Sequence, residues 1–404
     1  MSMLMMSSPI FDRRMEVQAY LLRYRSVSDG ASSGAPSVLD SLRSAGLDAF
    51  SSVKPLFVPA NARTLLAEEP FFAAAKVALL LEEDVRPVEP YFTEVAKLRS
   101  SGLKIAAMGE QPTNMLRVLN YIFYDHSEIE QSNSLNAHHS TVRSHHPDII
   151  TIAQGLVDGH AHKRAKAEGY GLFEGRFYLE RPTDSVTKLP QPKAQLINII
   201  NGVREKDFDL EKVANMVETN QALSGAMLRF INSPHILGDR EEIISAHHAI
   251  VVLGQDEVRK WLSAAVLRTL GEQGKPEELI RLSLVRARLC ELLAPDFGLG
   301  DFAQDLFLLG LFSLVDIILE VKMQQAAQMI MLPTEVQSAL TQGGGRFFPV
   351  LSFVQQYEQA QWRTVMRYAS SYNLDLAKIS KAYIDALRWY NELLLGSRPA
   401  ARRA

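Results

Sequence analysis

The residues with the greatest capacity for chemistry are histidines. Seven of the ten lie in one window, at His126, His138, His139, His145, His146, His160 and His162. The pairs 138/139 and 145/146 are seven residues apart, so on a helix each histidine lies two turns from its counterpart. Two turns span about 10 Å, which is too long for one shared metal ion. The spacing therefore favours a solvated, histidine-rich helix and leaves a zinc site in the window 126–162 as the alternative.

Other reactive side chains lack the sequence neighbours that catalysis requires. Cys290 lies on the apolar helical pattern ARLCELL, which predicts a buried structural thiol. His247 and His248 stand in ISAHHAIVVLG without an adjoining carboxylate, so we expect local packing or capping. The run GGGR at residues 343–346 lacks the Lys-Ser/Thr of a phosphate loop, which indicates a turn.

Composition narrows the class of protein. A chain of 404 residues with 47% apolar and 22% charged residues is globular and long enough for two or three domains. The net charge of −3 disfavours nucleic-acid binding through the overall field. One cysteine excludes an intramolecular disulfide and suits a reducing compartment. The opening MSMLMMSSPIFDRR is unlike a signal peptide, and the longest apolar run, LFLLGLFSLV, is about half of a membrane span. We expect a cytoplasmic protein that does not bind membranes.

The secondary structure that the sequence predicts differs between the first and the second part of the chain. The first ~185 residues alternate apolar runs with helical patterns, which predicts a mainly parallel sheet covered by helices. Predicted strands are Glu16–Tyr24, Pro55–Val58, Lys76–Leu81, Lys104–Ala107, Tyr121–Tyr124, Ile149–Ile152 and one near Arg176–Leu179, with helices including Val38–Ala45, Pro90–Ser100 and Gly159–Ala167. An eightfold barrel usually needs at least ~200 residues, so a reduced or incomplete barrel is expected.

A proline-rich break at Glu180–Lys193 separates this part from a second, helical part. Segments such as DEVRKWLSAAVLRTL carry apolar residues at helical spacing. The predicted fold class is α/β followed by all-α. We place the first domain at residues 1–182, a linker at 183–188, the helical domain at 189–396 and a tail at 397–404.

Two stretches together resemble a known family. PIFDRRMEVQAYLLRYRS resembles the opening of EAL-type cyclic di-GMP phosphodiesterase domains, in the variant that precedes an HDOD (HD-related output) domain. The second part resembles HDOD from Leu189–Pro190 through DLEKVANMVETNQALSGAMLRFINS and ISAHHAIVVLGQDEVRKW. The resemblance implies a degenerate, reduced EAL-type barrel followed by an all-helical HDOD domain.

The positions that matter most in the EAL family have changed here. EAL enzymes hold two divalent cations with Glu, Asn and Asp residues at strand ends, and hard cations require such oxygen ligands. By this resemblance, the family's ligand positions fall on Leu21, Pro59, Leu80, Met108, Gly109 and Gln154. In the second part, the His-Asp pair of HD hydrolases falls on Ser313 and Leu314, and an earlier histidine falls near Leu282. We therefore expect no catalytic residue, no metal and no cofactor in either part.

These losses predict a catalytically inactive bacterial signalling adaptor. It would act through protein partners within or beside a cyclic di-GMP network that controls motility, biofilm or surface behaviour, and a homodimer is compatible with the resemblance. The alternative is a receptor that binds cyclic di-GMP or another nucleotide without cleaving it. Arg25 matches an EAL arginine that faces the ligand phosphate and is the retained candidate contact for such a nucleotide. Leu21, Leu80 and Met108 make this pocket less suited to phosphates, because buried anions need paired donors.

Overall fold

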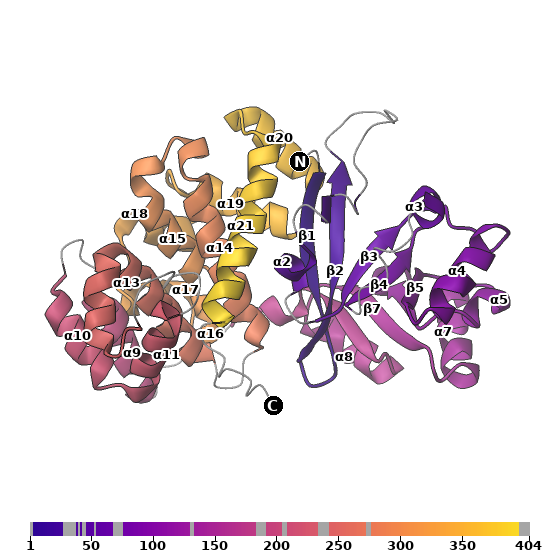
Figure 1. Cartoon of the computed structure of the whole chain (residues 1–404), viewed down its shortest axis with the longest axis horizontal. Coiled ribbons are helices and arrows are strands. Elements are labelled where there is room, and N and C mark those ends of the chain that lie inside the picture. The colour runs from indigo at the N-terminus through magenta and orange to yellow at the C-terminus, as the bar shows by residue number, and fades with distance from the viewer. Residues whose placement is uncertain are drawn as a thin grey trace. The chain divides into compact units, whose positions relative to one another are not determined.

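The chain divides into two compact units, Met1–Glu180 and Arg181–Ala404, in a computed structural model. The predicted boundary at residue 182 lies two residues from this division. The structure describes residues 3–26, 38, 41–42, 46–51, 54–67, 76–129, 133–182, 191–203, 208–232, 242–271 and 276–395. The predicted linker 183–188 and tail 397–404 lie outside these residues. Figure 1 shows the elements of each unit.

The first unit is a closed barrel of eight strands in sequence order. The strands are β1 (Met3–Phe11), β2 (Val17–Ser26), β3 (Leu56–Ala60), β4 (Val77–Leu81), β5 (Lys104–Met108), β6 (Tyr121–Asp125), β7 (Ile150–Leu156) and β8 (Leu172–Gly175). Neighbours from β2 to β8 are parallel, whereas β1 is antiparallel to both β2 and β8. The predicted α/β class is confirmed, and the barrel closes in fewer residues than usual because a tight hairpin joins β1 to β2 without a covering helix.

Two strands depart from the sequence prediction. β1 was not predicted, because MLMMSSPIF has neither clean alternation nor β-branched residues before Ile10. The last strand was expected near Arg176–Leu179, but β8 ends at Gly175 and Phe177–Leu179 forms a 3-10 turn, η2. Gly175 has φ of +147°, and a Cβ there would lie 2.2 Å from the Leu156 carbonyl oxygen. Glycine at this position therefore allows the close approach of β7 and ends the strand.

Short helices cover the barrel between strands. They are α2 (Leu47–Ser51), α3 (Ala62–Ala67), α4 (Tyr91–Ser100), α5 (Thr113–Leu116), α6 (His126–Ile129), α7 (Asn133–His145) and α8 (Gly159–Glu168). α4 and α8 agree with prediction to within one residue at each end, whereas much of Val38–Ala45 lies outside the described residues. α8 begins where Asp158 accepts a 2.8 Å hydrogen bond from the Ala161 N–H, and it ends at Gly169 in the left-handed region.

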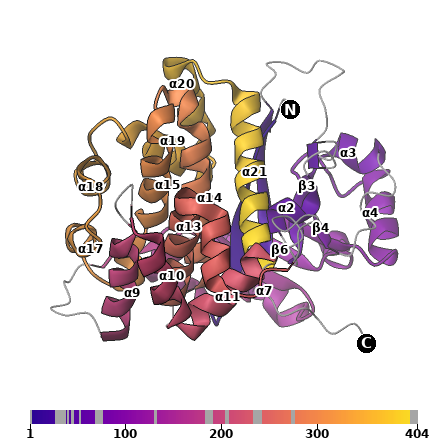
Figure 2. The same ribbon diagram turned by 60° about the vertical axis from the view of Figure 1, so that its left-hand side comes forward.

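The second unit is helical throughout its described residues, as predicted. Its helices are α9 (Gln191–Gly202), α10 (Leu210–Glu218), α11 (Gln221–Ile231), α13 (Ala246–Gly271), α14 (Glu277–Leu293), α15 (Ala303–Phe312), α16 (Val315–Leu319), α17 (Met323–Met329), α18 (Thr334–Thr341), α19 (Phe348–Glu358), α20 (Trp362–Tyr372) and α21 (Leu376–Leu395), with 3-10 turns η3 (Pro295–Phe297) and η4 (Gly300–Phe302). Figure 2 shows α14 lying beside α15 and α21.

Two glycines explain features of this helical unit. Gly254 divides α13, with φ of 75° and ψ of 170°, values that glycine adopts readily. Gly310 lets α15 approach α14, because a Cβ there would lie 2.6 Å from the Ala287 Cα. Cys290 of α14 is fully buried, as predicted, and burial raises the pKa of its thiol far above the usual range. None of the described helices has the length and apolar character needed to span a membrane.

Candidate functional site at the barrel mouth

The floor of the barrel interior is an apolar layer. It consists of Ile10, Ala19, Leu21, Phe57, Ala78, Leu80, Ala106, Phe123 and Ile152. The Phe57 ring meets the Phe123 ring edge-on, with centroids 5.1 Å apart. Side chains alternate between the two faces of a strand, so the next inward position lies two residues further along each parallel strand. This rule gives a ring at the carboxyl ends of the strands, where barrel enzymes place their active sites.

We call this set the mouth ring. Its members are Arg23, Pro59, Glu82, Met108, Asp125, Gln154 and Glu174. The structure thus brings together the positions predicted from the resemblance, in two layers. Leu21 and Leu80 lie in the floor at 3% and 4% exposure, and Pro59, Met108 and Gln154 lie in the mouth ring, with Gly109 directly after Met108. Arg25 is exposed four residues beyond Leu21, where β2 pairs with Leu4 of β1.

A partly buried ion pair occupies one side of the mouth ring. Arg23 Nη2 lies 3.0 Å from Glu174 Oε1, and the Glu174 side chain is 4% exposed. The Gly155 N–H donates to Glu174 Oε2 over 3.2 Å. This contact depends on an irregularity of β7 between Ala153 and Leu156, where Gly155 has φ of +78°. Two donors therefore engage the Glu174 carboxylate, which leaves it poorly placed to coordinate a cation.

The other side of the ring presents acceptors. Asp125 and Gln154 are direct partners in the pairing of β6 with β7. Ser127 donates to Asp125 Oδ1 through its N–H, over 2.9 Å, and through its hydroxyl, over 2.6 Å. Gln154 is 7% exposed, and its Oε1 has no hydrogen-bond donor among the described residues. A buried amide oxygen without a donor costs free energy, so it is available to a ligand.

Glu82 is held from outside the ring. The Tyr24 hydroxyl donates to Glu82 Oε1 over 2.8 Å. Burial and the Glu82 carboxylate raise the pKa of Tyr24 far above its usual range, so this tyrosine stays a donor. In the described parts of the chain, no three His, Cys, Asp or Glu side chains lie close enough together to hold a metal ion.

Sequence reasoning missed Arg23, Glu82, Asp125 and Glu174 as members of this site. A usable signal existed for three of them, because the inward alternation continues from Leu80 to Glu82, from Phe123 to Asp125 and from Leu21 to Arg23. Glu174 required the correct position of β8. The hydrogen bond from the Gly155 N–H to Glu174 depends on the irregularity of β7, which no periodicity indicates.

The histidine window forms a packed layer on the barrel instead of a fully solvated helix. His139 is 3% exposed, stacks on Tyr170 at 4.0 Å and lies 3.3 Å from Thr151 Oγ1. Burial, and then the nearby Arg143 and His138 charges, lower the pKa of His139 to about 4. The helical spacing of 138 and 145 is correct, but the expectation of solvation is wrong for His139 because that face of α7 covers β6 and β7.

Three more histidines of the window have distinct surroundings. His162 stacks on Phe177 with centroids 4.3 Å apart, and burial followed by Lys166 lowers its pKa. His126 is buried, with Nε2 3.4 Å from Glu168 Oε2. His160 is exposed. His139 and His162 of the window therefore stack on aromatic rings, and His126 lies beside a single carboxylate.

In the helical unit, a buried ion pair lies where the resemblance places the His-Asp pair. Arg286 is 1% exposed, and its Nε and Nη2 donate to Glu358 over 2.7 to 3.1 Å. Its Nη1 donates to Ser313 Oγ over 2.6 Å, and Ser313 donates to the Gly310 carbonyl. Leu314 is buried, and Leu282 is partly buried on α14. Ser313 thus serves as an acceptor for a structural arginine.

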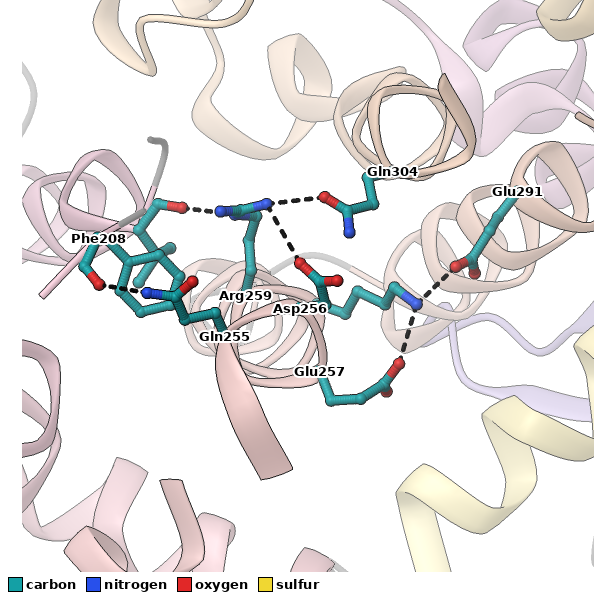
Figure 3. A network of polar contacts seen from close by, with 9 residues as sticks. Phe208, Gln255, Asp256, Glu257, Arg259, Glu291 and Gln304 are labelled. Atoms are coloured by element: carbon teal, nitrogen blue, oxygen red, sulfur yellow. Dashed lines mark hydrogen bonds and ion pairs between the residues drawn. The ribbon is translucent and has the colours of Figure 1, made fainter. Parts of the chain in front are cut away.

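A second network ties α13 to its neighbours (Figure 3). Arg259 Nε donates to the Val203 carbonyl over 2.8 Å and Nη1 donates to Gln304 over 2.9 Å. Lys260 lies 2.6 Å from Glu291 and 3.0 Å from Glu257. Burial lowers the pKa of Lys260, but the two carboxylates more than offset it and the net shift is upward.

The pair His247 and His248 corrects one expectation. His247 does have a carboxylate partner, with Nε2 2.8 Å from Glu211 Oε2, and this hydrogen bond raises its pKa. The partner lies on α10, 36 residues away in sequence, so the local pattern could not reveal it. The N–H of His248 donates to Ser245 Oγ at the start of α13, so the capping side chain there is Ser245 and not a histidine as expected.

Comparisons with known proteins agree with this two-part architecture. A family model described as HDOD domain matches residues 189–341. The chain carries an HDOD domain. The protein YuxH of Bacillus subtilis, which is uncharacterized, is 26% identical over 404 residues and covers 96% of this chain and 97% of YuxH. The cyclic di-GMP phosphodiesterase CdgJ of Vibrio cholerae is 29% identical over 233 residues, which are 57% of this chain and 53% of CdgJ.

Solved structures that match this chain include EAL proteins. The EAL enzyme Bd1971 in its cGMP-bound form has a TM-score of 0.33 at 14% identity and covers 43% of this chain and 60% of its own. BlrP1 of Klebsiella pneumoniae, in a complex with calcium and cyclic di-GMP, has a TM-score of 0.35 at 15% identity over 43% and 54% of the two chains. The EAL domain of Mycobacterium smegmatis DcpA has a TM-score of 0.33 at 16% sequence identity, and the match covers 43% of this chain and 90% of the DcpA domain. The HDOD domain lies in the helical unit.

Proposed function

We propose that this chain is a catalytically inactive signalling adaptor that works within or beside a cyclic di-GMP network and acts through protein partners. The observation that carries the proposal is the composition of the barrel floor. Leu21 and Leu80 bury hydrocarbon where the EAL resemblance puts metal-binding carboxylates. Hydrocarbon offers no lone pair to a hard divalent cation, and a two-metal hydrolysis depends on such ligands.

The charge of the mouth ring supports the same conclusion. A cyclic dinucleotide carries two negative phosphates, and a protein that binds it without metal ions needs cationic side chains to contact them. The one arginine in the ring, Arg23, already contacts Glu174. Glu82 and Asp125 add negative charge at the ring. Repulsion and desolvation therefore disfavour the nucleotide receptor that stands as the alternative.

In the HDOD domain, the position where the resemblance places the His-Asp pair has a structural role. Arg286, Glu358 and Ser313 form a closed set of hydrogen bonds. Such a set ties α14 to α19 and to the end of α15. The proposal gives the helical unit a role in binding protein partners. It also includes a cytoplasmic location and allows a homodimer.

The decisive experiment incubates the purified full-length protein with cyclic di-GMP, and separately with pGpG, in Mg²⁺ and then in Mn²⁺. We expect turnover no higher than a blank without protein, while an active EAL phosphodiesterase run beside it consumes the substrate. Turnover above the blank, removed by Leu80→Ala but not by the surface change Arg363→Ala, would overturn the proposal.

Calorimetric titration with cyclic di-GMP separates the adaptor from the receptor. We expect no saturable heat at micromolar concentrations. Micromolar binding that Arg25→Ala abolishes and Arg363→Ala leaves intact would establish the receptor instead. Both arginines are exposed, so neither change should unfold the protein.

A further inference from the structure

Exposed apolar side chains gather at the loops that follow the barrel strands. Val88 follows β4 and is 54% exposed, Met108 ends β5 and is 41% exposed, and Val157 follows β7 and is 75% exposed. The carboxyl ends of parallel strands meet at one end of a barrel, so these side chains border the same opening. Exposed apolar groups that gather at one place mark an interaction surface, whereas isolated ones carry no such meaning.

The same loops carry more acids than bases. In the described loops between strands β3 to β7 and the helices that follow them, the basic side chain is Arg86. The carboxylates there are Glu82, Glu83, Asp84, Glu89, Glu110 and Asp158. Asp125 ends β6, and Arg23 and Arg25 lie near the end of β2. This excess of negative charge raises the local concentration of cationic groups and repels nucleic acid and anionic lipid surfaces.

A buried acceptor on β7 belongs to the mouth ring of this opening. Gln154 Oε1 has no donor among the described residues, although the residue is 7% exposed. Gln154 lies between Asp125 on β6 and Glu174 on β8. Both hydrogen bonds from Ser127 go to Asp125 Oδ1, which leaves Oδ2 as a second acceptor within the described structure. A cationic donor that reached this point would satisfy Gln154 and pair with Asp125 at once.

We propose that the barrel mouth is a docking surface for a partner protein, which inserts an arginine or lysine side chain toward Asp125 and Gln154. Val88, Met108 and Val157 would contact the apolar residues that flank this basic side chain. The long methylene stem of such a residue packs on apolar groups while its charged end reaches polar ones. The inference rests on the proposed adaptor function, for which it supplies the surface and the chemistry of the partner.

A short peptide tests this directly in the full-length protein. The probe is acetyl-Leu-Arg-Leu-amide, and the comparison peptides carry citrulline or glutamate in place of arginine. Methionine methyl groups labelled with ¹³C report binding by NMR, and Met108→Leu assigns the relevant signal among the 13 methionines. We expect a saturable shift of the Met108 methyl signal with the arginine peptide, and a weaker one at higher salt.

Two variants examine the acceptors. Asp125→Asn keeps the shape of the side chain and an acceptor for Ser127, yet it should weaken the arginine peptide at least about tenfold because the charge is gone. Gln154→Met removes an acceptor on which the described fold does not depend, so binding should weaken while the protein remains folded. Glu94→Gln on the outer helix α4 is the matched control, and binding should stay within about twofold.

Three outcomes would overturn the docking proposal. They are no saturation with the arginine peptide, equal binding of the citrulline peptide, or an unchanged affinity in Asp125→Asn. Equal binding of free acetyl-arginine amide and the peptide would assign the site to a small cationic molecule and would also overturn it. Cyclic di-GMP turnover is measured without peptide, so failure of the adaptor proposal and failure of the docking surface are distinguishable.

Discussion

Leu21 and Leu80 bury hydrocarbon in the barrel floor, and the same two strands place Arg23 and Glu82 two residues further on. A single step of the alternation thus separates an apolar layer from a charged one. These charged residues already have partners within the protein, because Arg23 contacts Glu174 and Tyr24 donates to Glu82. The chemistry of this barrel end depends on which residues already have partners and which, like Gln154, lack a donor among those described.

His139 should make stability depend on pH. Its pKa is about 4 in the folded protein and about 6.5 when unfolded. Between these values the unfolded chain binds more protons, so the free energy of unfolding should fall as pH decreases from 6.5 to 4, by up to roughly 3 kcal/mol. Denaturant titrations across this range should show a flatter dependence in His139→Phe, which retains a ring against Tyr170.

The exposed Asn136 on the same helix, which does not titrate, provides the control. Asn136→Gln should leave the pH dependence of the free energy of unfolding unchanged. An unaltered slope in His139→Phe would show that His139 does not supply it.

The buried pair Arg286 and Glu358 should be sensitive to loss of either partner. Glu358→Gln leaves an arginine that is 1% exposed without its counter-charge, which should cost about 3 to 5 kcal/mol. Replacing both residues, as Arg286→Met with Glu358→Leu, should cost clearly less than the sum of the single changes. Chemical denaturation of the four proteins in this cycle measures the coupling, and additive effects would contradict it.

Elements were predictable where the sequence repeats a simple period. The runs KVALLL and KIAA gave β4 and β5 almost residue for residue, because strands buried on both faces are continuously apolar. β1 escaped detection because its MLMMS run contains no β-branched residue, and β8 has only four residues. Part of the candidate site could be predicted from the sequence, since the alternation of inward-facing residues along the strands leads to Glu82 and Asp125. The Arg23–Glu174 pair, the bond from the Gly155 N–H to Glu174 and the lack of a donor to Gln154 among the described residues are features of tertiary geometry, which a sequence period does not encode.

The kink in α13 should depend on glycine for backbone reasons alone. Gly254 has φ of 75°, and a Cβ added at this position would meet no other atom within 4 Å. Gly254→Ala should therefore cost about 1 to 3 kcal/mol through strain without any clash. In contrast, Gly225→Ala inside α11 should stabilise by up to about 1 kcal/mol. Thermal unfolding of both variants tests the sign of each change in stability. An unchanged stability of Gly254→Ala would mean that the helix can straighten.

At the level of the whole molecule, the barrel and the helical unit each have their own core. Calorimetry of the full-length protein should therefore resolve two transitions. Gly175→Ala, which introduces a Cβ against the Leu156 carbonyl, should lower the transition of the barrel. Glu358→Gln should lower that of the helical unit, by several degrees. A single transition that both variants shift equally would contradict this expectation.

Closure of the barrel has a consequence during synthesis. The first strand completes its hydrogen bonding only when Ile10 and Phe11 meet Glu174 and Phe173 at the far end of the same unit. A nascent chain on the ribosome can form the opening hairpin early, yet the other edge of that hairpin stays open until β8 has emerged. Chaperones that shield apolar edges should therefore engage this protein during translation, before any partner can reach the finished barrel.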